Sequence, residues 1–233
     1  NGGADGNNGL SWATAKATIA NALSTLSSGA AAEVYVMATS TSYGTLNLNV
    51  SGAAYDLPQR LRLISFSTVG SNARLSGGSP TLDINATNAS VEGFRIYGST
   101  GTYGVNITSD RNVRLFRCLI YDHTAGDGGV LLDNCTSVVI RNCDFYNCKS
   151  AVRIPSTITT CTLINNIFKN NTSYGVEEAG GAPVPTLRYN NFHGNPANKD
   201  YKDTGAGDQA YTWLNGQAGM YSNQGFDPLF VNA

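Results

Sequence analysis

Charged residues are scarce in this chain of 233 residues. Lysine, arginine, aspartate and glutamate make up 13% of the sequence, and the formal net charge is −1. A chain so nearly neutral has no basic field with which to hold a phosphate backbone or an anionic membrane surface. We therefore expect no binding of nucleic acid.

Long apolar runs and a leader segment are also missing. No stretch approaches the roughly 18 apolar residues of a membrane span, so we expect no membrane insertion. The chain opens with Asn1-Gly2-Gly3, without Met or a signal peptide, so we expect a mature protein or an excised piece. Asparagine, serine, threonine and glycine are abundant instead, which suits stacked turns and an extracellular protein, secreted or on a surface.

Motifs for metals and nucleophiles are absent from the sequence. The five cysteines lack the paired C-x-x-C spacing of a zinc site, and the two histidines lie far apart in the chain. No nucleophile elbow, phosphate-binding glycine loop or zinc-binding helix occurs. We expect no metal site and no cofactor, and at least one cysteine that is free or pairs with another chain.

Apolar residues recur about every 24 positions, which is the signature of a solenoid. Three columns advance together by 24, 25, 23 and 24 residues. They contain Val91, Leu115, Ile140, Leu163 and Leu187; Phe94, Cys118, Cys143, Asn166 and Asn190; and Ile96, Ile120, Phe145, Phe168 and Phe192. A fourth column contains Leu82, Val105, Val130, Val152 and Val176. Steps that vary together predict coils stacked in register.

Each coil offers three short stretches with apolar residues at every second position, so each stretch turns one face inward. Stacking in register at about 4.8 Å per coil buries these faces and pairs the strands in parallel. We therefore predict an all-β fold, a parallel β-helix of about 24 residues per coil. In the column that holds Cys118 and Cys143 we expect stacked thiols, and Asn166 and Asn190 should continue it as a hydrogen-bonded ladder.

The two ends of the chain depart from the repeat. We expect one domain, 1–233, with an N-terminal cap over 1–32, coils over 33–195 and an irregular segment, a loop or lid, over 196–233. Within the cap, residues 11–26 place Trp12, Ala15, Ile19, Ala22, Leu23 and Leu26 on one face, which predicts an amphipathic capping helix over the first coil.

Several segments resemble a known group of proteins. They are the opening GADGNNGLSWATAKATIANAL, the N-N-x-F pattern at Asn165 and Asn190, and the closing segment from Gly225 to Val231. They resemble bacterial and phage-associated right-handed β-helix proteins of the pectate-lyase-like superfamily. The resemblance implies a right-handed β-helix. Because the superfamily contains lyases, hydrolases, epimerases, adhesins and phage tail proteins, the resemblance specifies an architecture and not a chemistry. The further segment that usually follows D-P-L-F is absent, so we expect a truncated module.

One candidate site is the outward column that follows the inward Ile96 column. It contains Tyr97, Tyr121, Tyr146, Lys169 and His193. Stacked tyrosines on successive coils could lie against sugar rings, or they could stabilise the exposed strands by stacking on each other. Both interpretations stay open from the sequence.

A second candidate is the outward column Asp83, Asn106, Leu131, Arg153 and Glu177. The resemblance implies a polysaccharide groove here, with Ca²⁺ held by carboxylates and Arg153 as the base of a lyase, but Leu131 interrupts the column and Asp83 lies about three coils from Arg153. A hydrolase would need two close carboxyl groups, from Asp122 and Asp127 beside His123, or from Glu177 and Glu178, which face opposite ways along a strand.

The sequence thus favours an extracellular structural or adhesive module, a component of a surface, a filament or a virion. Its lateral face would contact a glycan or copies of the chain itself. The alternative is an enzyme that acts on polysaccharides, namely a Ca²⁺-dependent lyase of uronic-acid polymers.

Overall fold

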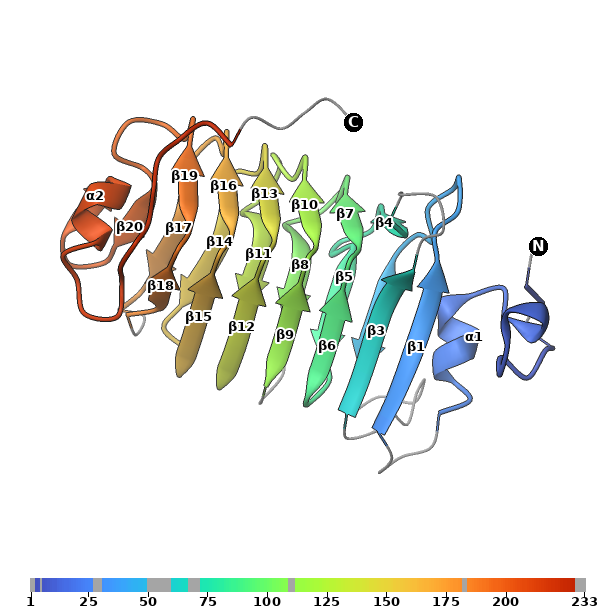
Figure 1. Ribbon diagram of the computed structural model, residues 1–233. Coiled ribbons are helices and arrows are strands. Elements are labelled where there is room, and N and C mark those ends of the chain that lie inside the picture. The colour runs from blue at the N-terminus through green and yellow to red at the C-terminus, as the bar shows by residue number, and fades with distance from the viewer. Residues whose placement is uncertain are drawn as a thin grey trace.

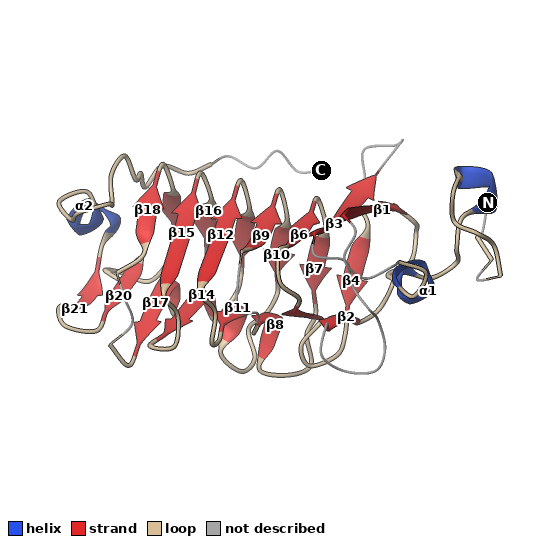
Figure 2. Ribbon diagram, turned by 90° about the horizontal axis from the view of Figure 1, so that it is seen from below, coloured by secondary structure: helices blue, strands red, loops and turns tan. Residues whose placement is uncertain are grey.

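The computed structural model describes residues 3–4, 6–26, 31–49, 60–66, 72–108, 112–181 and 184–228. Their strands form three sheets that run side by side along a single solenoid (Figures 1 and 2). From β3 to β20 each coil contributes one strand to each sheet in turn, so that neighbouring strands within a sheet come from successive coils. The predicted parallel β-helix of about 24 residues per coil is confirmed.

The seven-stranded sheet contains the stretch that opens each coil. Its strands, in order, are β1 (Ala31–Met37), β3 (Arg60–Phe66), β6 (Ala89–Glu92), β9 (Val113–Phe116), β12 (Ser137–Arg141), β15 (Thr160–Ile164) and β18 (Thr186–Arg188). The six-stranded sheet follows it around the coil. Its strands are β4 (Arg74–Ser76), β7 (Arg95–Tyr97), β10 (Leu119–Tyr121), β13 (Asp144–Tyr146), β16 (Ile167–Lys169) and β19 (Asn191–His193).

The eight-stranded sheet completes each coil. Its strands are β2 (Leu46–Asn49), β5 (Leu82–Asn85), β8 (Tyr103–Ile107), β11 (Gly128–Leu132), β14 (Ser150–Pro155), β17 (Tyr174–Ala179), β20 (Tyr201–Asp203) and β21 (Gly207–Gln209). Among the described strands all pairings are parallel except that of β20 with β21. No described helix is both long and apolar enough to cross a bilayer.

The four predicted columns are confirmed as inward columns. Val91 pairs with Leu115, Ile96 with Ile120 and Leu82 with Val105, and the later members continue in register. Nearly all of these side chains are fully buried. Phe145, Phe168 and Phe192 stack face to face, with ring centroids 5.1 and 4.8 Å apart. The core is therefore one continuous cylinder of apolar side chains along the solenoid.

A single residue with positive φ makes the tight turn between the seven-stranded and the six-stranded sheet in each coil. From β6 onward this residue is Gly93, Arg117, Asn142, Asn165 and Tyr189, with φ of 77°, 52°, 55°, 54° and 57°. Asparagine tolerates this left-handed conformation better than most residues. The pair Asn165-Asn166 follows from this geometry, because Asn165 makes the turn and Asn166 points inward, while one coil later Tyr189 makes the turn and Asn190 points inward.

Inward side chains at the turns link successive coils by hydrogen bonds. Asn166 accepts from the backbone N–H of Cys143 at 2.9 Å and donates to the Ile140 carbonyl at 3.0 Å. Asn190 repeats the pattern one coil later, as it accepts from the Asn166 N–H at 3.0 Å. The predicted asparagine ladder is confirmed, and Asn223 extends it by one further step.

The cysteines take the same structural role. The Sγ of Cys143 lies 3.5 Å from the N–H of Cys118 and 3.6 Å from the Leu115 carbonyl. All five cysteines are buried, free thiols, so the predicted thiol stack is confirmed and no disulfide joins them. Burial raises the pKa of the Cys148 thiol to about 12, which keeps it protonated and unreactive.

The N-terminal cap is less helical than the sequence suggests. Within residues 11–26 only η1 (Trp12–Thr14) and α1 (Ile19–Leu23) form, so the prediction of one continuous helix was wrong. Thr18 accepts from the Asn21 N–H and so starts a new helix, which favours a break before it. Ile19 and Leu23 are buried beside β1, and the side chain of Trp12 lies outside the described residues.

The C-terminal segment is a folded cap, so the prediction of a loop or lid was wrong for 196–228. It adds β20, β21 and α2 (Tyr211–Leu214), and residues from 229 on lie outside the described part. Tyr221 bridges to Arg188 of β18, Gln224 bridges to Asn191 of β19, and β21 pairs with β20. The three strands of the last coil, β18, β19 and β20, are therefore covered at this end.

Candidate lateral binding face

The tyrosine column lies on the outer face of the six-stranded sheet, as the sequence predicts. Tyr97, Tyr121 and Tyr146 pair in register on β7, β10 and β13. The rings of Tyr97 and Tyr121 stack with centroids 5.0 Å apart and an interplanar angle of 17°. Tyr146 is 39% exposed. We call these three residues the tyrosine ladder.

The three hydroxyl groups of the tyrosine ladder have no hydrogen-bond partner among the described residues. The same holds for the charged side-chain groups of Arg95 and Asp144, which stand two positions before Tyr97 and Tyr146 and so share their outward face. Arg95 and Asp144 are separated by Leu119 on the strand between them. The face thus carries hydroxyls, one guanidinium and one carboxylate that the protein leaves unbonded.

Asp144 lies in an apolar setting. Its neighbours in register are Leu119 on β10 and Ile167 on β16. Burial raises the pKa of the Asp144 carboxyl to about 6. Burial also raises the pKa of Tyr121, while Arg95 and Arg74 lower it, which places both guanidinium groups within electrostatic range of this tyrosine.

The remaining two residues of the predicted column, Lys169 and His193, are in register with Tyr146 but lie under the C-terminal segment. The Asp227 carboxylate accepts from the Lys169 ammonium at 2.7 Å and lies 3.9 Å from the imidazole of His193. Figure 1 shows this segment crossing beside β19 and β16. Lys169 and His193 are therefore bound by the chain itself, and the accessible part of the column is the tyrosine ladder.

The second predicted site, on the outer face of the eight-stranded sheet, is in register but is occupied by internal bonds. Arg153 forms an ion pair with Asp127 at 3.0 Å. Glu177 binds Lys202 at 3.1 Å and accepts from the Ser150 hydroxyl at 2.7 Å. These contacts use the very groups that a lyase would direct at its substrate.

The other lyase candidate, Asp83, lies away from this network. Register places Asn106 and Leu131 between Asp83 and Arg153, so three strand steps separate the carboxylate from the guanidinium. Asp83 accepts a hydrogen bond from Asn106 at 3.1 Å. In the described part of the chain, no three His, Cys, Asp or Glu side chains are grouped as ligands of a metal ion would be.

Neither predicted pair of hydrolase carboxyl groups is arranged as a pair. Glu177 points outward, while Glu178 is 1% exposed and contacts the hydroxyl of Tyr201 inside the solenoid. The Asp122 carboxylate accepts from Asn147. Asp127 accepts instead from Tyr103 and pairs with Arg153.

His123, which stands between the candidate carboxyl groups Asp122 and Asp127 in the sequence, is buried and turned away from them into the solenoid. His123 is 2% exposed and occupies an inward turn position, with its Nε2 atom 3.2 Å from the Ile96 carbonyl. Burial lowers the pKa of this imidazole. Its place resembles that of Cys148 one coil later, whose Sγ lies 3.7 Å from the Ile120 carbonyl. His123 is thus a structural link between coils.

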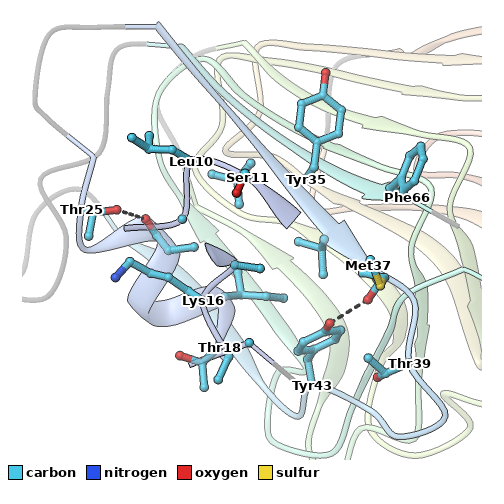
Figure 3. A pocket seen from close by; sticks show the side chains of 18 of the residues that line it. Leu10, Ser11, Lys16, Thr18, Thr25, Tyr35, Met37, Thr39, Tyr43 and Phe66 are labelled. Atoms are coloured by element: carbon cyan, nitrogen blue, oxygen red, sulfur yellow. Dashed lines mark hydrogen bonds between the residues drawn. The ribbon is translucent and has the colours of Figure 1, made fainter. Parts of the chain in front are cut away.

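A hollow of about 1410 Å³ lies between the N-terminal segment and β1 (Figure 3). Lys16 lines it from the N-terminal segment, and Tyr35 and Met37 line it from β1. Its polar groups are held by the protein, because the Tyr43 hydroxyl donates to the Met37 carbonyl and Lys16 donates to the Asn7 carbonyl. The hollow is the seam between the cap and the first coil, and we assign no chemistry to it.

Comparison with known families agrees with this architecture. A family model described as "Right handed beta helix region" matches residues 63–225, which is more than half of the chain. The chain therefore belongs to this family of right-handed β-helix proteins. Searches of curated proteins and of solved structures gave no match. The finer resemblance to the pectate-lyase-like superfamily, and a bacterial or phage origin, stay predictions.

Sequence reasoning missed three residues of the lateral face: Arg95, Asp144 and Asp227. The first two could have been found by reading two positions back from each tyrosine, since residues i and i−2 of a strand share a face. Asp227 had no such signal, because it stands beyond the last regular coil.

Proposed function

We propose that this protein is an extracellular β-helical module that holds a polysaccharide against the tyrosine ladder. The observation that carries this proposal is the set of unbonded polar atoms around stacked, partly exposed aromatic rings. A sugar ring presents an apolar face that can lie on a tyrosine and hydroxyls that can bond to the atoms at its edge. The rigid stack of coils would hold these groups in place before the ligand arrives, which lowers the entropic cost of binding.

The regular spacing of the ladder supports a polymer as the ligand. Successive tyrosines stand one coil apart, at about 4.8 Å, along the axis of the solenoid. An extended glycan can therefore contact several of them at once, and weak contacts at each position would add along the chain. This is an adhesive or structural role in which the bound polymer is not changed.

Replacement of a ladder tyrosine tests the proposal. We expect Tyr121→Ala and Tyr146→Ala each to weaken binding to soluble polysaccharides by about tenfold, because each removes one stacking surface. The control is Tyr221→Ala, since Tyr221 and Tyr146 are equally exposed, at 39%, but Tyr221 lies on the C-terminal cap. Binding would be measured by affinity gel electrophoresis against a panel of polysaccharides, followed by calorimetry with the best one.

Two results would contradict the proposal. The first is equal binding by the ladder variants and the control. The second is that the unaltered chain releases unsaturated sugar products from a uronic-acid polymer in the presence of Ca²⁺, and that Arg153→Ala does not. This result would establish the lyase instead.

A further inference from the structure

The charges beside the tyrosine ladder carry information about the kind of polysaccharide. Arg95 lies beside its first tyrosine and Asp144 beside its last, with Leu119 between them. Neither charge has an ion pair among the described residues, and Lys169, the next cation along the sheet toward the C-terminal end, is neutralised by Asp227. Arg74 on β4 stands in register beside Arg95 and donates to the backbone carbonyls of Thr39 and Ser40. The face therefore has guanidinium groups at its first coils and a carboxylate, Asp144, two coils beyond Arg95.

An anionic polymer fits this face poorly. A uronate or sulfate group over Arg95 would be attracted, but the same group repeated along the polymer would meet the Asp144 carboxylate. Like charges in an apolar setting repel strongly, and Leu119 and Ile167 flank Asp144 on its two neighbouring strands. A neutral hydroxyl group can bind at both positions, because it can accept a hydrogen bond from the Arg95 guanidinium and donate one to the Asp144 carboxylate.

The position of Asp144 supports this assignment. A carboxylate kept half-buried between two aliphatic side chains without a bonded partner is costly, and the protein supplies no donor to offset the cost. A ligand hydroxyl would be that donor. We propose that the ligand of the tyrosine ladder is a neutral, hydroxyl-rich polysaccharide chain, oriented by a hydrogen bond to Asp144 at one end and to Arg95 at the other.

This inference rests on the proposed function and adds the class of glycan. The test compares a soluble neutral glucan, hydroxyethyl cellulose, with polygalacturonate and dextran sulfate, all by affinity electrophoresis. We expect the neutral polymer to bind best, with an affinity nearly independent of added salt, since salt screens only charge–charge attraction. Tighter binding of either anionic polymer, weakened by salt, would overturn the inference and leave the ladder as a glycan site.

Two substitutions test the orienting residues. We expect Asp144→Asn to weaken binding of the neutral polymer about tenfold, because the charged acceptor is lost while the shape is kept. Arg95→Gln should act in the same direction. The matched controls are Asp133→Asn, at a turn of the eight-stranded sheet, and Arg141→Gln, on the outer face of the seven-stranded sheet. Both controls should bind as the unaltered chain does.

The pH dependence gives a separate readout. Asp144 lies on β13. The charged and titratable groups on its own strand and on the two neighbouring strands are Tyr146 on β13, Tyr121 on β10 and Lys169 on β16. With a pKa of about 6, Asp144 loses its acceptor charge as the pH falls through this value, so affinity should fall there too. Asp144→Asn should remove that fall.

The outcomes separate the two claims. If Tyr121→Ala weakens binding but Asp144→Asn binds unchanged at every pH, the inference is wrong and the proposed function stands. If no polymer of any charge binds, both are wrong. The carboxylate of Asp144 accepts no hydrogen bond within the described part of the protein, so the Asn variant should fold normally, which circular dichroism would check.

Discussion

The interior columns carry different chemistry in the middle coils and in the last ones. In one turn column, Phe94, Cys118 and Cys143 are followed by Asn166 and Asn190. In a strand column the apolar run ends differently. Ile84, Ile107, Leu132 and Ile154 are followed by Glu178, which is just as buried.

The difference teaches how the solenoid ends. In the middle, every coil has another coil on each side, so apolar packing alone can fill the column. At the C-terminal end the column must join a cap that does not repeat. Glu178 contacts the hydroxyl of Tyr201 and lies 3.5 Å from the N–H of Thr204. At this end of the solenoid, hydrogen bonds between Glu178 and the cap replace the apolar packing between coils.

The largest expected effect is in the middle. Phe145→Ala should lower the free energy of unfolding by about 3–5 kcal/mol, because it removes a fully buried ring from a stack and leaves a cavity. Chemical unfolding followed by circular dichroism would measure this. The control is Phe66→Ala, since Phe66 is 39% exposed on β3. Equal losses for the two variants would mean that the column contributes little beyond surface contacts.

An intermediate effect is expected in the asparagine ladder. Asn190→Ala leaves the Asn166 N–H and the Leu163 carbonyl without their partner. We expect the free energy of unfolding to fall by about 1–3 kcal/mol for each buried group that loses its hydrogen bond. Asn190→Cys should cost less, because Cys143 already fills the corresponding position two coils earlier with weaker bonds of the same pattern. If the cysteine variant is as unstable as the alanine variant, the two residue types are not equivalent in this column.

The repeat made most of the fold predictable. The steps shared by the Val91, Phe94 and Ile96 columns define the strands, the register and the inward faces, since a solenoid imposes the same environment on each coil. The tyrosine ladder followed from the same period. The positions of Arg95 and Asp144 could also have been read from the strand alternation, but the lack of bonding partners for their side chains is visible only in three dimensions.

The ends were not predictable for a physical reason. The apolar spacing of residues 11–26 suits a helix, but Ser11 and Thr18 each accept a hydrogen bond from a backbone N–H and divide the segment in two. At the other end, Asn223 continues the asparagine column 33 residues after Asn190, well outside the period of the coils. A period search finds only residues that recur at the period.

The smallest effect concerns Glu178 and depends on pH. Burial raises the pKa of this carboxyl, and the hydrogen bonds from Tyr201 and Thr204 lower it by less. Between the ordinary pKa of 4.5 and the raised value, the unfolded chain releases the proton and the folded chain keeps it. The stability contributed by Glu178 is thus greatest at low pH and falls as the pH rises through that window, by about 1.4 kcal/mol for each unit of the difference.

Glu178→Gln should therefore stabilise the C-terminal cap at neutral pH and change little at about pH 4, where both states hold the proton. Hydrogen exchange of β20 and α2 would report on the cap separately from the middle coils. Asp200, whose pKa burial also raises, titrates in both proteins and cancels in their difference. Glu177→Gln, one residue away and outward, is the control and should show no such gain. If Glu178→Gln increases the stability of the C-terminal cap equally at both pH values, the buried charge of Glu178 is not the cause of the increase.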